Sequence, residues 1–185
     1  MKKLLFSICV ALCILFLLLS INYITSKEYY THYGPYTKFM RKVSMDCYKE
    51  KMLTLFENSM TYIELLEWVD EKVDWPSEND SFERELYPFQ ILKVGKGRCI
   101  EHSSFYVAAC LAHGYRARLI RSLYPDDHAW AEVKLNSSWV CVETVDKIIN
   151  QPYRRFDSGK YEIAKVVAYE PFMYEDITRN YVRMK

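Results

Sequence analysis

The most constraining feature of the sequence is the stretch from Gly95 to Asp146, in which one helical pattern is followed by two strand patterns. Small and apolar residues recur at helical spacing from Cys99 to Leu111, and Gly114 ends that pattern. The segment from His128 to Leu135 alternates strictly, and a second strand pattern runs from Trp139 to Glu143 after a turn-like Asn-Ser-Ser. These periods predict a helix that is followed by a β-hairpin.

Cys99 stands in the first turn of the predicted helix. The first backbone N–H groups of a helix have no partner within it, and the helix dipole is positive at that end. Both effects favour a thiolate, which is the nucleophilic form of cysteine. Cys99 is therefore placed to be a nucleophile. Taken alone, a cysteine at this position is better explained as a buried structural thiol, and it is His128, Glu143 and the flanking spacing that favour catalysis.

His128 opens the first strand of the predicted hairpin, and Glu143 closes the second. If the loop between the strands has two residues, both side chains face the same side of the sheet and meet diagonally. A three-residue loop would turn Asp146 to that side instead, so Asp146 remains the alternative. An imidazole beside a thiol takes its proton and later gives it to a leaving amine, while a carboxylate orients the imidazole. We expect a triad of Cys99, His128 and Glu143.

Three segments together carry a resemblance to a known family: GKGRCIEHSSFYVAACLAHGYRARLI, DDHAWAEVKL and SSWVCVETVD. From roughly Tyr87 to Asp146 the chain resembles the transglutaminase-like domain of the papain-like cysteine peptidase superfamily, which also includes peptide:N-glycanase-type amidases. The resemblance implies that Cys99 is the nucleophile and His128 the base. Glu143 stands where the family usually has an aspartate, which is a departure that adds one methylene.

The resemblance also implies an oxyanion site close to the nucleophile. The backbone N–H of Cys99 is one expected donor. In the family an upstream polar or aromatic side chain supplies another, and the candidates here are Gln90, Trp75 and Trp68. We further expect that Trp130 and Trp139 either line the cleft and keep water out of it or are simply part of the core.

Two Cys-x-x-His pairs suggest a metal site at first sight. They begin at Cys99 and Cys110, which lie about 16 Å apart along a single helix. Zinc ligands sit about 2.0–2.3 Å from the ion, so one ion does not bridge the pairs. We expect no metal, and no nucleotide, flavin or haem cofactor, because the sequence has neither a Gly-x-Gly-x-x-Gly nor a Walker motif. A net charge of +1 gives no indication of a nucleic-acid partner.

The N-terminal segment from Leu4 to Ile21 is uncharged and apolar over a length that approaches one bilayer crossing. A cleaved signal peptide has similar features, but the exit from Leu18 to Tyr23 has no small-x-small cleavage site. We therefore expect an uncleaved signal anchor. Lys2 and Lys3 predict a cytoplasmic N-terminus and an extracytoplasmic domain on the far side of a single-pass membrane helix.

These patterns divide the chain of 185 residues into three parts: an anchor over 1–25, a tyrosine-rich juxtamembrane linker over 26–36, and a transglutaminase-like domain over 37–185. Amphipathic helices are predicted over 36–58 and 61–75, and a strand over 115–123. The expected fold class is α+β, with a papain-like or transglutaminase-like core in which helices pack on a small antiparallel sheet.

The function expected from the triad is that of a membrane-anchored cysteine enzyme acting on amide bonds of proteins or peptides. Cys99 forms a thioester acyl-enzyme, and hydrolysis by water is favoured over cross-linking to an amine, because water is always present. The alternative is an inactive scaffold of the same fold that binds a peptide or glycan at the membrane surface, a hypothesis motivated by Glu143 in place of aspartate. The oligomeric state is left open.

Overall fold

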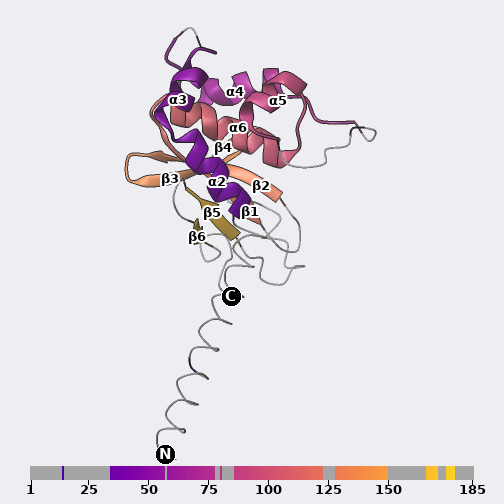
Figure 1. Cartoon of the computed structure of the whole chain (residues 1–185). Coiled ribbons are helices and arrows are strands. Elements are labelled where there is room, and N and C mark those ends of the chain that lie inside the picture. Colours follow the sequence, from indigo (N-terminus) through magenta and orange to yellow (C-terminus); the bar gives the residue numbers. More distant parts are fainter. Residues whose placement is uncertain are drawn as a thin grey trace, which may run out of the picture. The chain divides into compact units, whose positions relative to one another are not determined.

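A computed structural model of the chain describes residue 14 and residues 34–56, 58–77, 80, 86–122, 128–149, 166–170 and 174–177. The chain divides into two compact units, residues 1–36 and 37–185. Nearly all described elements belong to the second unit (Figure 1). The predicted anchor segment, from Leu4 to Ile21, lies outside the described residues except for Ile14. No helix among the residues described here is long and apolar enough to cross a membrane.

The described helices all precede the strands of the sheet in the sequence. They are α2 (Gly34–Val43), α3 (Asp46–Leu53), α4 (Tyr62–Lys72), α5 (Pro88–Val94) and α6 (Cys99–Ala112). The single helix predicted over 36–58 is wrong, because a turn at Ser44 and Met45 separates α2 from α3. The hydroxyl of Ser44 donates to the carbonyl of Arg41, a local bond that competes with continuation of the helix.

The strands form one six-stranded sheet in the order β4-β3-β2-β1-β5-β6, and every neighbouring pair is antiparallel. They are β1 (Arg116–Ser122), β2 (His128–Leu135), β3 (Ser138–Glu143), β4 (Ile148–Ile149), β5 (Val166–Tyr169) and β6 (Tyr174–Asp176). The expected α+β class with an antiparallel sheet is therefore confirmed. The long hairpin of β2 and β3 lies beside β1 in the middle of the sheet.

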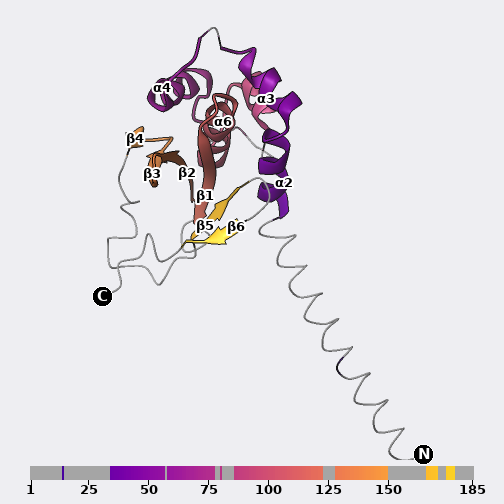
Figure 2. The ribbon, with the colours of Figure 1, turned by 90° about the vertical axis from the view of Figure 1, so that its left-hand side faces the viewer.

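Helix α6 is the centre of the core. Every residue from Glu101 to Ala112 is buried, since the helix contacts α3, α4 and α5 as well as strands β1 and β2. Figure 2 shows α6 running between the other helices and the sheet. A helix covered on all sides is apolar or small on all sides, which explains the run of alanine, serine and aromatic residues in its sequence.

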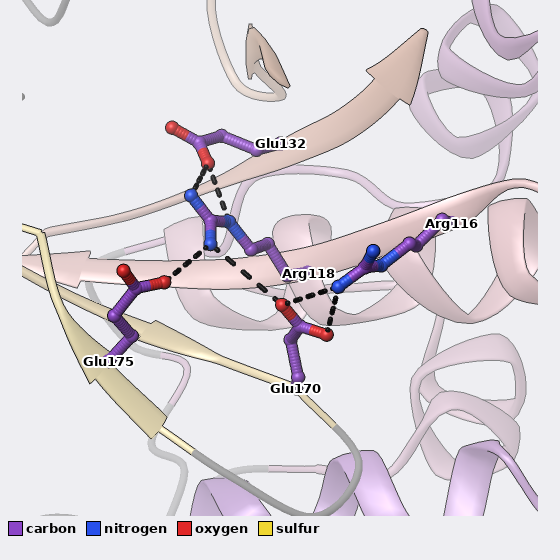
Figure 3. A network of polar contacts seen from close by, with 5 residues as sticks. All are labelled: Arg116, Arg118, Glu132, Glu170 and Glu175. Carbon is purple, nitrogen blue, oxygen red and sulfur yellow. Dashed lines mark hydrogen bonds and ion pairs between the residues drawn. The ribbon is translucent and has the colours of Figure 1, made fainter. Parts of the chain in front are cut away.

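The sheet face that α6 does not cover carries a charged network (Figure 3). Arg118 of β1 is buried, and its guanidinium contacts the buried carboxylate of Glu132 on β2 at 2.6 Å. The same guanidinium lies 3.2 Å from Glu175 of β6 and 3.9 Å from Glu170. The ring of Trp139 lies 4.0 Å from the guanidinium carbon of Arg118. One cation thus joins β1, β2, β3 and β6 across the sheet.

The Arg118–Glu132 pair predicts that two arginines on the same strand and face contribute unequally to the free energy of unfolding. Replacing Arg118 by Met leaves a carboxylate buried without its partner, so we expect a loss of about 3–5 kcal/mol in the free energy of unfolding. Arg116→Met is the matched control, because Arg116 is exposed and pairs with Glu170 at the surface, where such a pair contributes less than about 1 kcal/mol. Urea unfolding of both variants measures the difference. Equal losses in the free energy of unfolding would show that burial does not increase the contribution of the pair to stability.

Candidate active site

The segment before α6 holds Cys99 in place through its backbone. The backbone N–H of Asp74 donates to the carbonyl of Gly95 at 2.9 Å, and the N–H of Gly97 donates back to the carbonyl of Asp74 at 3.0 Å. This parallel bridge fixes the approach of the chain to the helix. At Gly97 an added Cβ would overlap the Cβ of Glu101, so the close approach requires glycine.

Glu101 closes the same corner from inside. Its carboxylate is fully buried and accepts hydrogen bonds from the N–H groups of Arg98 at 3.0 Å and Leu86 at 3.3 Å. Burial raises the pKa of this carboxyl, although the two N–H groups act against the rise. Cys99 follows directly after Arg98, the N-cap residue of α6, and is partly exposed. The nucleophile candidate therefore stands at a rigidly held helix start that reaches the surface.

His128 and Glu143 meet at the edge of the hairpin. The loop between β2 and β3 consists of Asn136 and Ser137, and Asn136 has the left-handed backbone that such a two-residue turn needs. The resulting register pairs Ala131 with Val142, which puts Glu143 diagonal to His128. The Nε2 atom of His128 lies 2.7 Å from Oε2 of Glu143. The longer side chain of glutamate thus reaches the imidazole directly.

The second partner of His128 is the thiol of Cys99, which hydrogen-bonds to the imidazole. Since Glu143 takes Nε2, Nδ1 is the ring nitrogen left for the thiol. Burial is the largest single influence on the imidazole and would lower its pKa. The hydrogen bonds and the charges of Cys99 and Glu143 together overcome burial and raise the pKa of His128 to about 9.

The structure brings Cys99, His128 and Glu143 together and leaves the alternative third residue outside. Asp146 is exposed in the turn over 144–147 that follows β3. Cys110, on the same helix as Cys99, is fully buried, and burial raises the pKa of its thiol to about 12. Among the residues that the structure describes, no three His, Cys, Asp or Glu side chains gather as metal ligands do.

The two tryptophans expected in the cleft or the core lie in different places: Trp130 is a core residue beside His128, and Trp139 is far from it. Trp130 is fully buried in a cluster with Ile120 and Val166, and its ring stacks against that of His128 with centroids 6.0 Å apart. It therefore supports the imidazole from within the core. Trp139 pairs with Lys134 at the opposite end of β2, about 20 Å from His128 at the usual rise of a strand, and its ring lies against cations there.

The three side chains considered for the oxyanion site differ in their surroundings. Trp68 packs between Phe56 and Phe105, and Gln90 accepts a hydrogen bond from the N–H of Tyr87 at the surface. Trp75 directly follows the bridge residue Asp74, and its ring lies 6.3 Å from that of His102. His102 is three residues after Cys99, which is about one helical turn. Of the three, Trp75 is the side chain associated with the start of α6.

Sequence reasoning missed a buried pair of hydroxyls, Ser103 and Thr144, behind the site. Their oxygens lie 2.8 Å apart, and the hydroxyl of Ser103 also donates to the carbonyl of Ala129. Ser103 was read only as a small residue at a helical position. The sequence does place polar residues such as Ser103 within a largely apolar helix. The partners of Ser103, however, depend on how α6 packs on the sheet.

Residues 58–144 match the model of the transglutaminase-like superfamily, which is just under half of the chain. The chain is also similar to peptide-N(4)-(N-acetyl-beta-glucosaminyl)asparagine amidases. The amidase of Drosophila melanogaster is 31% identical over 94 residues, which cover 50% of this chain and 15% of that protein. The amidase of Oryza sativa subsp. japonica is 26% identical over 109 residues, which cover 58% of this chain and 24% of that protein. The chain thus corresponds to a quarter or less of either relative.

Among solved structures, the chain is similar to Rad4-Rad23 bound to a 6-4 photoproduct UV lesion. The TM-score is 0.58 at 17% identity, over 87% of this chain and 50% of that one. A second similar structure is Rad4-Rad23 crosslinked to an undamaged DNA, with a TM-score of 0.56 at 15% identity, over 78% of this chain and 45% of that one. At such identities these likenesses show a shared fold.

The contacts of His128 predict its titration. Its pKa of about 9 in the folded chain exceeds the value of about 6.5 in an unfolded one. The charged imidazole therefore stabilises the fold fully below about pH 6.5, and this stabilisation is lost as the pH rises through about 9. We expect Glu143→Gln to lower the titration midpoint of His128, measured by NMR of the ring in the full chain. Asp146→Asn is the control and should leave the midpoint unchanged. The reverse pattern would assign the orienting carboxylate to Asp146.

Proposed function

From this transglutaminase-like domain, we propose that the chain is a cysteine-dependent hydrolase of amide bonds in proteins or peptides. The observation that carries the proposal is the placement of His128 between two partners. Glu143 lies 2.7 Å from one of its ring nitrogens, and the thiol of Cys99 is the second partner. A histidine held between a thiol at a helix start and a carboxylate is the arrangement that thiol nucleophiles need.

The reaction proceeds in two halves. The sulfur of Cys99 attacks the amide carbon, and His128 holds the thiol proton and delivers it to the leaving nitrogen as the C–N bond breaks. This step leaves a thioester and a free amine or ammonia. His128 then takes a proton from water as the water oxygen attacks the thioester carbon, and returns that proton to sulfur when the C–S bond breaks. Glu143 orients the imidazole throughout.

The negative oxygen formed in each half needs hydrogen-bond donors. The backbone N–H of Cys99 belongs to the first turn of α6, where N–H groups have no partner within the helix. We assign the second donor to the indole N–H of Trp75, because this residue is exposed and stands beside the bridge that leads into α6.

The class of amide is suggested by the similar proteins. Their names describe amidases acting on asparagine that carries N-acetylglucosamine, and a glycosylated asparagine in a peptide is therefore the first substrate to test. Hydrolysis is favoured over cross-linking, since water needs no separate site. The scaffold alternative was motivated by Glu143 in place of aspartate, and the short contact between Glu143 and His128 supports the catalytic proposal over it.

The test compares single cysteine variants of the full chain. We expect Cys99→Ser to lower hydrolysis of a glycosylated asparagine peptide by about 10³-fold or more. Cys110→Ser, a buried cysteine on the same helix, is the matched control and should keep activity. Alkylation of Cys99 by iodoacetamide at pH 7, followed by mass spectrometry, should slow in His128→Ala. Equal alkylation of wild type and His128→Ala would favour a non-catalytic scaffold that binds peptide or glycan.

We also propose that the enzyme is held at a membrane by its N-terminal segment, with the domain outside the cytoplasm. The support is the uncharged run from Leu4 to Ile21 after Lys2 and Lys3. In cells expressing the full chain, the protein should stay in the membrane pellet after an alkaline carbonate wash, whereas a variant with Leu12→Arg and Leu17→Arg should be released. Release of both proteins would refute an integral anchor.

A further inference from the structure

A buried chain of two hydroxyls lies directly behind the triad. The hydroxyl of Ser103 donates to the carbonyl of Ala129 at 3.0 Å, and its oxygen is 2.8 Å from that of Thr144. Ser103 and Thr144 are both completely buried. Because Ser103 has one proton and gives it to Ala129, the hydroxyl of Thr144 must donate to the oxygen of Ser103. The direction of every bond in this chain is therefore set.

Each member of the hydroxyl chain is a close neighbour of one triad residue. Ser103 lies one helical turn after Cys99 on α6, Ala129 follows His128 on β2, and Thr144 follows Glu143 at the end of β3. Helix α6 is separate in the sequence from the β2–β3 hairpin and meets it only through tertiary packing. We propose that Ser103 and Thr144 are positioning residues that set the relative placement of Cys99, His128 and Glu143, an inference that rests on the proposed function.

Apolar contacts alone do not hold this placement. Most of the contact between α6 and β2 is made by small and apolar side chains, and such contacts have little directional preference. A hydrogen bond has a narrow range of length and angle, and at a buried site no water replaces it. A shift of about 1 Å in a reacting group can cost about 100-fold in rate. The two hydroxyl bonds add a directional link between α6, which carries Cys99, and the hairpin, which carries His128 and Glu143.

The neighbouring serine shows what an uninvolved hydroxyl does. Ser104 is also buried and on the same helix, but its hydroxyl donates to the carbonyl of Glu101 within α6 itself. It therefore joins the helix to nothing else through that bond. Ser103 and Ser104 form a natural pair in which one hydroxyl connects the elements of the triad and the other does not.

The experiment uses the full chain with Ser103→Ala, Thr144→Val and Thr144→Ser, and with Ser104→Ala as the control. Two quantities are measured: the rate of Cys99 alkylation by iodoacetamide at pH 7, and the midpoint of the His128 ring titration by NMR. We expect the rate to fall about tenfold in Ser103→Ala and Thr144→Val, and the midpoint to move toward the ordinary histidine value of about 6.5. Thr144→Ser, which keeps the hydroxyl, and Ser104→Ala should match wild type.

The outcomes separate positioning from stability and from catalysis. Variants that lose thermal stability but keep the wild-type midpoint and rate would overturn the inference, since the hydroxyls would then serve the fold alone. If Ser103→Ala does not fold, Thr144→Val decides, because valine has nearly the shape of threonine. If wild-type Cys99 reacts no faster than in His128→Ala, the proposed function fails. The His128 midpoint then still decides positioning: a fall in Thr144→Val supports it, and no change refutes it.

Discussion

The structure depends on the burial of α6 on every side. A helix enclosed by three other helices and two strands has no face toward water, so a polar group on it can be satisfied only inside the protein. Ser103, Ser104 and Glu101 are satisfied in this way, each by a hydrogen bond to backbone. Only the first turn reaches the surface, and Cys99 is located there. The same enclosure that makes the core therefore leaves one position on the helix open to reagents.

The two faces of the sheet serve different purposes. One face packs on α6 through alanine and valine residues of β2. The other begins at His128, continues through the buried ring of Trp130, and ends in the charged network around Arg118. Along this face the polar groups at both ends are paired, and the apolar ring lies between them. The hairpin can thus present an imidazole at its end without leaving a charge unpaired beneath it.

The parts of the fold that the sequence predicts are those that depend on local periods. The helix from Cys99 and the alternation of β2 follow from residue type and spacing. The sequence left the loop at Asn136 open between two and three residues, and the observed two-residue turn is what brings His128 and Glu143 together. The sites of Trp139 and Ser103 do not follow, because their partners come from other strands and from the stacking of layers. The break between α2 and α3 also escaped prediction, since the residues at the turn, Ser44 and Met45, do not interrupt the apolar pattern.

The bridge between Asp74 and Lys96 determines where the sequence of the domain can tolerate insertions. Its hydrogen bonds hold both ends of the segment from Trp75 to Gly95 next to each other. A change of length inside a segment whose ends are held costs little, about 0.6 kcal/mol for each doubling of a flexible loop. Helix α5 within this segment packs on α6, so insertions before Pro88 are those that would add surface without altering that contact. This segment is therefore where new substrate preferences could be introduced by lengthening the chain while the nucleophile keeps its place.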